Sequence, residues 1–449
     1  MKIAYIGLGK MGKNMVELLL EQGIEVVAYN RHPEAVKEVA EKGAIPAFTY
    51  KEIFDHLDDD QRIIWLMVPH SAVSHVIDEI KPFLKKEDIV IDGGNSLYEN
   101  SITYAKDLEQ KGVHFLDIGV SGGPWGARHG SCLLVGGPKK VYDIVLPLIQ
   151  AAAAPDSYKY LGETGAGHFA KMVHNGIEYV EMQLIAEIYS IVKKFMNNHE
   201  ISKLFNKWNK GHNSSYLLGI SHQIFQKKEG NKYLIDLISD KAENKGTGIW
   251  SSIAALKYGE PNSMVSSAVN SRFISKMKSE RIFLSENKPS LKKTTKIDLE
   301  VINKSYEFAR LINHIQSFNL IKKASKINGW EYNPSEISRV WTQGCIIRSE
   351  LMENLFLIFK TSKDLLKNKN ILEKLHELEQ CTSNLISHGL ENKIPLDAFS
   401  NSYNYWLSIC SDTSPANLIQ AQRDFFGGHG YSRIDKGLYK TFNSNWQKK

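Results

Sequence analysis

The sequence has few cysteines and no long apolar run, and these absences exclude several classes of protein. The 449 residues include four cysteines, Cys132, Cys345, Cys381 and Cys410, which are far apart and form no CxxC pair. This spacing argues against a zinc site or a redox motif and favours free thiols in a reducing cytosol. No run of eighteen apolar residues occurs, and "MKIAYIGLGKMG" enters patterned structure without a basic and apolar leader. We therefore expect a cytoplasmic protein without membrane spans, an export signal or a metal centre.

The composition predicts a large globular protein. Hydrophobic residues make up 42% and aromatic residues 10%, which is ample for a buried core, and the length favours two or three domains. The net charge of +6 comes partly from Lys-rich segments such as "KPSLKKTTK", which are usually solvated faces. This charge suits an anionic substrate or nucleotide, with nucleic acid as a minor alternative.

Apolar patterning divides the chain into two structural classes. Residues 1–170 alternate apolar runs such as "KIAYIGLG", "IEVVAYN" and "DIVIDGGN" with amphipathic segments, which predicts an α/β domain with a mostly parallel sheet. Residues 171–430 have a period near 3.6 and predict a large all-α domain, and 431–449 form a C-terminal tail too short for its own core. The longest helical stretches are expected at 176–196, 299–325, 344–366 and 370–389.

A faint internal echo is also present. "KMVHNGIEY" at 171 and "RVWTQGCII" at 339 share a basic start and a matching glycine, Gly176 and Gly344. The echo suggests a duplicated helical unit in which only the first copy carries an acid and an imidazole.

The first chemical motif is "GLGKMG", which places Gly7, Gly9 and Gly12 in a G-x-G-x-x-G frame between a strand and a helix. The first two glycines permit a tight turn and close approach to a pyrophosphate, and the third lets the helix pack on the strand. This motif predicts a dinucleotide-binding, Rossmann-like domain.

The second strand ends at Asn30, Arg31 and His32, where an NAD enzyme usually has a carboxylate. A guanidinium holds a 2′-phosphate by charge-assisted hydrogen bonds, so Arg31, with His32 beside it, favours NADP. NAD remains possible.

Two glycine-rich turns follow later strands. "DGGNS" contains Asn95, and "VSGGPWGARHG" offers the Ser121 hydroxyl and the backbone amides of Gly122 and Gly123, which suit a carboxylate. Ligands collect at such strand ends in open α/β sheets.

Polar side chains share one face of the helix predicted at 171–179. Lys171, His174, Asn175, Glu178 and Tyr179 have helical spacing, while apolar residues occupy the opposite face. Lys171 and Glu178 lie about 10 Å apart along the axis, about the length of a small ligand. The alternative is an ordinary solvated helix face.

Further cations have no motif of their own. "NKGTGIW" places Lys245 and Thr247 beside two glycines, like a phosphate cradle without a Walker frame. The spacing of Arg272, Arg423 and His429 assigns them no role.

Together, "IDGGNS", "GVSGG", "GAGHFAKMVHNGIEYVEMQLIAE", "KGTG" and "ANLIQAQRDFFGGHGY" resemble the decarboxylating 6-phosphogluconate dehydrogenases of the pentose phosphate pathway, over nearly the whole chain. The resemblance implies a homodimer whose C-terminal tail threads the other protomer. It implies Lys171 as general base, Glu178 as general acid and no metal. Implied cofactor contacts are Gly7, Gly9, Lys10, Met11, Gly12, Asn30, Arg31, His32, Val68 and Asn95. Implied substrate contacts are Asn95, Ser121, Gly122, Gly123, His174, Asn175, Tyr179, Lys245, Thr247 and Arg272, with Arg423 and His429 reaching in from the partner.

The implied reaction converts 6-phospho-D-gluconate and NADP to D-ribulose 5-phosphate, carbon dioxide and NADPH. "GLGKMG" and "SGGPWG" look more like a shorter, often NAD-using branch, and His32 replaces a common Thr. A related β-hydroxyacid dehydrogenase, such as one for 3-hydroxyisobutyrate, and a catalytically silent dinucleotide-binding protein are the alternatives.

Overall fold

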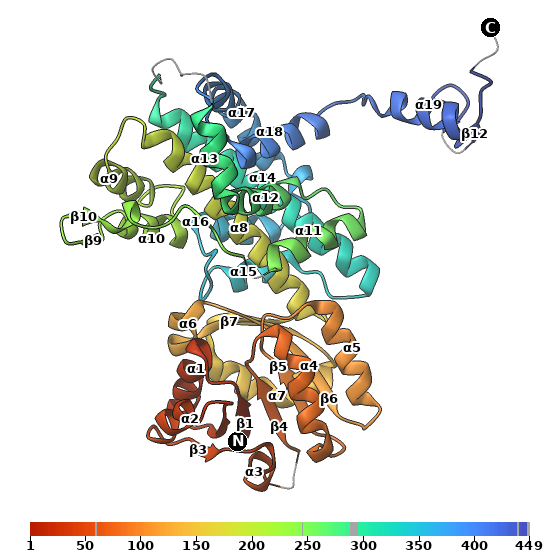
Figure 1. The fold of residues 1–449 in the computed structure, drawn as a ribbon. Helices are drawn as coiled ribbons and strands as arrows, with labels where there is room; N and C mark the ends of the chain where they lie inside the picture. The colour runs from red at the N-terminus through yellow and green to blue at the C-terminus, as the bar shows by residue number, and fades with distance from the viewer. Residues whose placement is uncertain (59–60, 245, 288–294, 438–439, 447–449) are drawn as a thin grey trace. The chain divides into compact units, whose positions relative to one another are not determined.

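The computed structural model describes residues 1–58, 61–244, 246–287, 295–437 and 440–446 (Figure 1). The chain forms two compact units, Met1–Ser402 and Tyr403–Lys449, which are described separately. Lys245, expected in the phosphate cradle, lies outside the described residues.

The N-terminal part of the first unit is an eight-stranded sheet in the order β3-β2-β1-β4-β5-β6-β7-β8. Neighbouring strands are parallel except for the antiparallel pair β6 and β7, which confirms the α/β prediction. The strands are β1 Lys2–Ile6, β2 Glu25–Tyr29, β3 Ile45–Ala47, β4 Ile63–Leu66, β5 Ile89–Asp92, β6 His114–Ser121, β7 Ser131–Gly136 and β8 Ala153–Tyr160.

Helices cover both faces of this sheet, so its strands are apolar on both sides. One core contains residues of α1 Lys10–Glu21, α2 Pro33–Ala40 and α7 Lys139–Ala152. The other contains residues of α3 Tyr50–Asp55, α4 His70–Ile80 and α5 Tyr98–Glu109. The short helix α6 Gly123–His129 connects β6 to β7.

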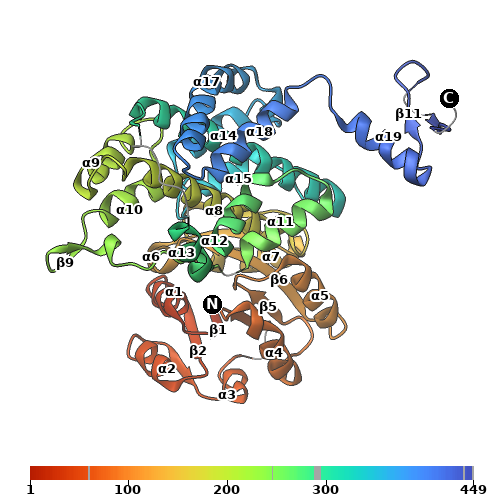
Figure 2. The ribbon, with the colours of Figure 1, turned by 45° about the horizontal axis from the view of Figure 1, so that its top comes forward.

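The remainder of the first unit is predominantly helical, as expected (Figure 2). Its two long helices, α8 Ala166–Val192 and α14 Leu299–Asn328, pack against each other, and α14 also packs on α17 Lys369–Glu391. The other helices are α9 Asn198–Trp208, α10 Tyr216–Ile224, α11 Thr247–Tyr258, α12 Ser263–Lys276, α13 Lys278–Glu286, α15 Pro334–Trp341 and α16 Glu350–Phe359. The boundary between the two units falls within α18 Asp397–Ile409.

The continuous helix predicted at 344–366 is wrong. Gly344 has φ +64°, which takes the backbone out of the helical region, and α16 starts only after Ser349. The Ser349 side chain accepts a hydrogen bond from Met352 N at 3.2 Å and so fixes the start of the new helix.

The sequence segments that start at residues 171 and 339 do not occupy equivalent places in the structure. Residues 171–179 lie inside α8, whereas 339–347 run from the end of α15 into a turn. A symmetric contact occurs elsewhere: Tyr216 N donates to Arg348 O at 3.1 Å, and Glu350 N donates to Ser214 O at 3.0 Å. These segments precede α10 and α16, each capped by a serine. The segment between α9 and α10 is therefore hydrogen-bonded to the segment between α15 and α16, and the duplication stays a prediction.

The second unit contains α19 Ala416–Gly427 and a small antiparallel pair, β11 Tyr431–Ser432 and β12 Thr441–Phe442. Throughout the described parts of the chain, every helix is too short or too polar to cross a lipid bilayer.

Candidate active site

The glycine motif lies between β1 and α1, where the sequence predicted it. Gly7 has φ +109°, and a Cβ there would lie 2.5 Å from Met67 O; a Cβ on Gly12 would lie 2.0 Å from Gly7 O. A Cβ on Gly9 would meet nothing within 4 Å, which leaves open space beside the loop. Lys10 and Met11 form the first turn of α1, whose leading N–H groups have no partners within the helix. This loop therefore suits a pyrophosphate.

Asn30 holds this loop against the end of β2. Its Oδ1 accepts a hydrogen bond from Leu8 N at 3.1 Å, and its Nδ2 donates to His32 O at 3.1 Å. The exposed Arg31 guanidinium lies 3.4 Å from His32 Nε2. The Arg31 guanidinium and the His32 imidazole lie side by side at the place where an NAD enzyme usually has a carboxylate, which would repel a 2′-phosphate. These side chains therefore fit a phosphorylated ribose.

Asn95 follows β5 and contacts the predicted catalytic helix. Asn175 Nδ2 on α8 donates to Asn95 Oδ1 at 3.1 Å. Val68 lies beyond the end of β4, and its carbonyl oxygen is 2.9 Å from where a Cβ on Gly94 would lie. Predicted cofactor and substrate residues thus meet at the carboxyl ends of neighbouring strands.

The polar stripe on α8 is buried. Lys171 is 7% exposed, His174 is fully buried, and Asn175 and Tyr179 are each 8% exposed, while Glu178 is half-buried. A solvated helix face is therefore excluded, and these polar groups line the interior of the unit.

Ser121, His174 and Lys171 form one hydrogen-bonded network. His174 Nε2 lies 3.1 Å from Ser121 Oγ, and its Nδ1 lies 3.3 Å from both Lys171 Nζ and Asn175 Oδ1. Burial, with the Lys171 charge, lowers the pKa of His174 well below its ordinary value, so the ring is neutral. A neutral ring accepts at one nitrogen and donates at the other, which suits it to link a hydroxyl with an amine.

Burial also lowers the pKa of Lys171. The nearby Glu178 opposes this shift, and so do the thiols of Cys132 and Cys345. Desolvation is the largest cause, so the protein stabilises the neutral amine relative to a lysine in water. A neutral lysine within reach of a hydroxyl is a competent general base.

Sequence reasoning missed the residues that place Lys171. The buried Asp117 carboxylate on β6 accepts hydrogen bonds from Gly165 N and His168 N, both at 2.7 Å, and so caps α8 from a neighbouring strand. Gly119, two residues further along β6, faces Lys171 directly. The available signal was a lone charge in the apolar run "VHFLDIGV".

The far end of the stripe contains further cationic and polar groups. The Arg272 guanidinium on α12 lies 3.8 Å from the centre of the Tyr179 ring, and its Nη1 donates to Ala268 O at 2.9 Å. Thr247 is the first residue of α11 and is buried. The helix start and the guanidinium both suit an anion.

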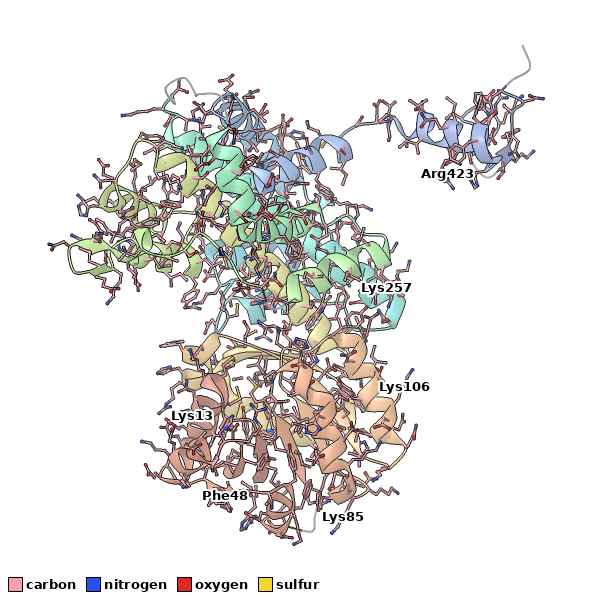
Figure 3. All side chains as sticks on the ribbon, in the orientation of Figure 1. Lys13, Phe48, Lys85, Lys106, Lys257 and Arg423 are labelled. Carbon is pink, nitrogen blue, oxygen red and sulfur yellow. The ribbon has the colours of Figure 1, made fainter. Side chains whose placement is uncertain are left out.

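The turn that carries Gly122 and Gly123 is covered by the segment after α15. A Cβ on Gly122, which has φ +125°, would lie 2.4 Å from Gly344 O. The ring of Trp341, the last residue of α15, meets the His174 ring edge-on, with 5.7 Å between the two ring centres. Arg423 and His429 belong to the second unit: Arg423 lies on α19 (Figure 3). His429 follows the end of this helix by two residues.

Two family models together match most of the chain. Residues 2–164 match the NAD binding domain of 6-phosphogluconate dehydrogenase, and residues 167–446 match the C-terminal domain of the same enzyme. The chain belongs to the 6-phosphogluconate dehydrogenase family.

Individual relatives of this family match over almost their whole length. The decarboxylating 6-phosphogluconate dehydrogenases of Salmonella typhimurium and Escherichia coli K12 are each 37% identical, with 98% of both chains covered. The Plasmodium falciparum enzyme, solved in complex with NADP+ and with 6-phosphogluconate, is 33% identical with a TM-score of 0.92, and the match covers 99% of this chain and 100% of that one. A 3-hydroxyisobutyrate dehydrogenase of Salmonella typhimurium is 18% identical, with a TM-score of 0.52 over 62% of this chain and 94% of its own, and shares the fold alone.

Proposed function

We propose that the protein oxidises and decarboxylates 6-phospho-D-gluconate to D-ribulose 5-phosphate with NADP as cofactor. The buried network of Ser121, His174 and Lys171 carries this proposal, because it places a lysine of lowered pKa beside a neutral imidazole. Full-length relatives at 37% identity are named for this activity.

NADP would be held by the glycine loop, Lys10, Met11 and Val68, with Arg31 and His32 at the 2′-phosphate. When bound, it accepts the hydride that leaves C3 of the substrate. Neutral Lys171 Nζ takes the proton of the C3 hydroxyl, so that a 3-keto acid forms. His174 orients this hydroxyl, and Asn95 and Asn175 bind between substrate and cofactor. Ser121, Gly122 and Gly123 hold the carboxylate end of the sugar acid.

Loss of carbon dioxide leaves the C1–C2 electron pair, which builds negative charge on the C3 oxygen. Protonated Lys171 returns its proton to that oxygen and gives an enediol. Glu178 then delivers a proton to C1 of the enediol, the former C2 of the substrate, while the again neutral Lys171 takes the proton of the neighbouring hydroxyl, which yields the ketone product. The substrate phosphate is bound by Tyr179, Lys245, Thr247 and Arg272.

We further propose a homodimer in which Arg423 and His429 of the partner subunit complete the phosphate site. Apolar side chains are exposed on α12 and α13, where Phe283 and Leu284 are each 65% exposed, and on α19, where Phe426 is 74% exposed. Exposed apolar surface of this kind marks an interaction site. The division at 1–170, 171–430 and 431–449 and the cytoplasmic location stay predictions.

A steady-state assay tests the function directly. Formation of NADPH absorbance and of carbon dioxide in equal amounts from 6-phosphogluconate is expected, with NADP preferred over NAD. Turnover of 3-hydroxyisobutyrate instead, or binding of NADP without turnover of either acid, would contradict the proposal.

A further inference from the structure

Asp424 is the centre of the hydrogen-bond network in the second unit. Its Oδ1 accepts from Gly430 N at 2.9 Å and from Asn443 Nδ2 at 2.8 Å. Its Oδ2 accepts from Ser444 N at 3.0 Å and from Trp446 Nε1 at 2.7 Å. One buried carboxylate therefore ties α19 to the residue before β11 and to the segment after β12.

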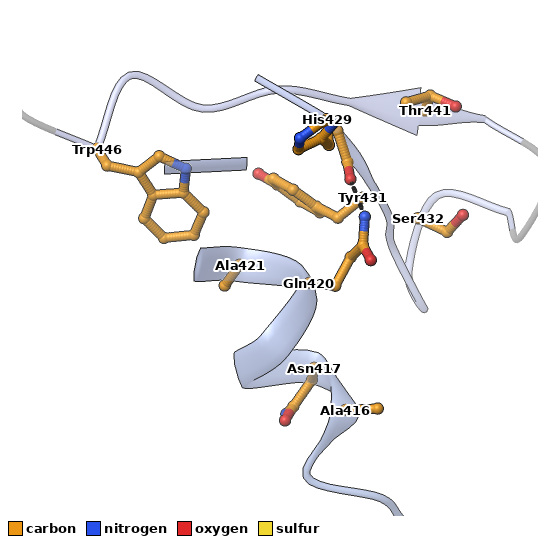
Figure 4. A pocket seen from close by; sticks show the side chains of 10 residues that line it. Ala416, Asn417, Gln420, Ala421, His429, Tyr431, Ser432, Thr441 and Trp446 are labelled. Atoms are coloured by element: carbon orange, nitrogen blue, oxygen red, sulfur yellow. Dashed lines mark hydrogen bonds between the residues drawn. The ribbon is translucent and has the colours of Figure 1, made fainter. Parts of the chain in front are cut away.

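Gln420 makes a second connection between the same elements. Arg423 Nη1 donates to Gln420 Oε1 at 3.2 Å. Gln420 Nε2 donates to Gly430 O (Figure 4). The residues Gln420, Arg423 and Asp424 follow helical spacing on α19, so one face of this helix carries both connections. Both peptide groups of Gly430 are thus bound to that face.

The loop between α19 and β11 fits closely around His429. A Cβ on Gly427 would lie 2.6 Å from His429 Nε2, and the Phe426 ring contacts the imidazole edge-on at 6.0 Å. Gly430 has φ +71°, and a Cβ there would lie 2.4 Å from Thr441 Cγ2. The backbone conformation around His429 therefore depends on Gly430 keeping its positive φ and its close packing against Thr441.

We propose that Asp424, assisted by Gln420, is a positioning residue that fixes Arg423 and His429 as a preformed pair of hydrogen-bond donors for the substrate phosphate. This inference rests on the proposed function, in which both side chains enter the partner's site. Preorganised donors bind an anion without a further loss of conformational freedom. Four donors to one carboxylate also keep it charged: the hydrogen bond from Ser444 N, with the others, lowers the pKa of Asp424.

The test is steady-state kinetics of full-length Asp424→Asn. An amide oxygen accepts only part of this network, and its NH2 group faces donors. We expect the KM for 6-phosphogluconate to rise about tenfold or more, with kcat and the KM for NADP within about threefold of the parent protein. Inorganic phosphate should compete more weakly by a similar factor.

Asp435→Asn is the matched control. Asp435 lies in the same unit and makes an exposed ion pair with Arg433 at 2.6 Å, so its loss should leave all constants unchanged. Gln420→Ala serves as a second variant should Asp424→Asn fail to form dimers, with the same selective rise in KM expected.

The outcomes separate the two proposals. A parent protein inactive on 6-phosphogluconate removes the proposed function. If Arg423→Ala raises the substrate KM but neither Asp424→Asn nor Gln420→Ala does, the function stands and the positioning role is overturned. A fall in kcat together with a rise in both KM values would also overturn it, since that result marks a general structural role.

Discussion

Gly119 on β6 and Lys171 on α8 are in such close contact that a Cβ on the glycine would lie 2.4 Å from the Cβ of the lysine. The approach continues at Gly167, where a Cβ would lie 2.4 Å from Leu134 O and 2.5 Å from Asp117 O. The first turns of α8 thus pack directly on strand backbone. Backbone packing and the Asp117 cap together determine where the lysine amine lies.

Gly119→Ala should displace Lys171 and lower kcat by about tenfold or more, because small errors in the position of a catalytic group are costly. The NADP dissociation constant, measured by fluorescence titration, should stay unchanged. Gly211→Ala is the control, since a Cβ there meets only Trp208 O at an ordinary 3.7 Å. Full activity of Gly119→Ala would contradict this prediction, because it would show that catalysis tolerates a displacement of Lys171.

Lys171→Met should abolish hydride transfer, with a loss of about a thousandfold or more, because no other base replaces the amine. NADP binding should remain measurable. Lys194→Met, in the exposed turn just after the same helix, should retain parental turnover. Substantial oxidation of 6-phosphogluconate by Lys171→Met would remove the lysine from its assigned role.

Glu178→Gln should lower kcat by about a hundredfold while the KM for 6-phosphogluconate changes little, because the amide cannot deliver a proton to C1. Stopped-flow absorbance separates the steps. A first burst of NADPH with slow release of ribulose 5-phosphate is expected, and unaltered steady-state turnover would contradict the assignment.

Glu187 on α8 should make stability depend on pH. Its carboxylate accepts hydrogen bonds from Ala398 N and Phe399 N, yet burial raises its pKa from 4.5 to about 7. Because the native state then binds more protons than the unfolded state, stability falls as pH rises from about 4.5 to 7, by about 3 kcal/mol in total.

Calorimetry at pH 5 and pH 8 tests this dependence. The stability of Glu187→Gln should no longer show the part of the pH-dependent decline that this carboxyl causes. Its overall melting temperature also reflects the loss of one of the hydrogen bonds donated by Ala398 N and Phe399 N. The exposed Glu373→Gln should show the parental decline. Identical pH dependence of Glu187→Gln and the parent would contradict the role of Glu187.

Local sequence patterns predicted much of the fold because strands and helices here follow their expected periods. The strand β8 was missed because Pro155 and Asp156 resemble a turn, although its partner β7 holds it in the sheet. The helix expected across 344–366 does not form at Gly344, where the backbone has a positive φ. The apolar periodicity of the sequence continues past this residue and so gave no sign of the interruption.

The candidate site was predictable where its residues share one helix. The helical spacing of Lys171, His174 and Asn175 predicted that their side chains lie together on one face. The hydrogen bonds among them follow from this spacing. The lone charge of Asp117 in an apolar run was a signal, but its partners and those of Trp341 could not be predicted, because their contacts with α8 depend on tertiary packing between segments far apart in sequence.

The contact between the Gly122 turn and Gly344 has a consequence for synthesis of the chain. The sheet can fold as soon as β8 leaves the ribosome, since all its strands precede residue 161. The Gly122 turn is covered only after the segment after α15 has emerged. A nascent chain stopped before that segment would hold the complete sheet with its Gly122 turn uncovered, and so would lack one side of the candidate site.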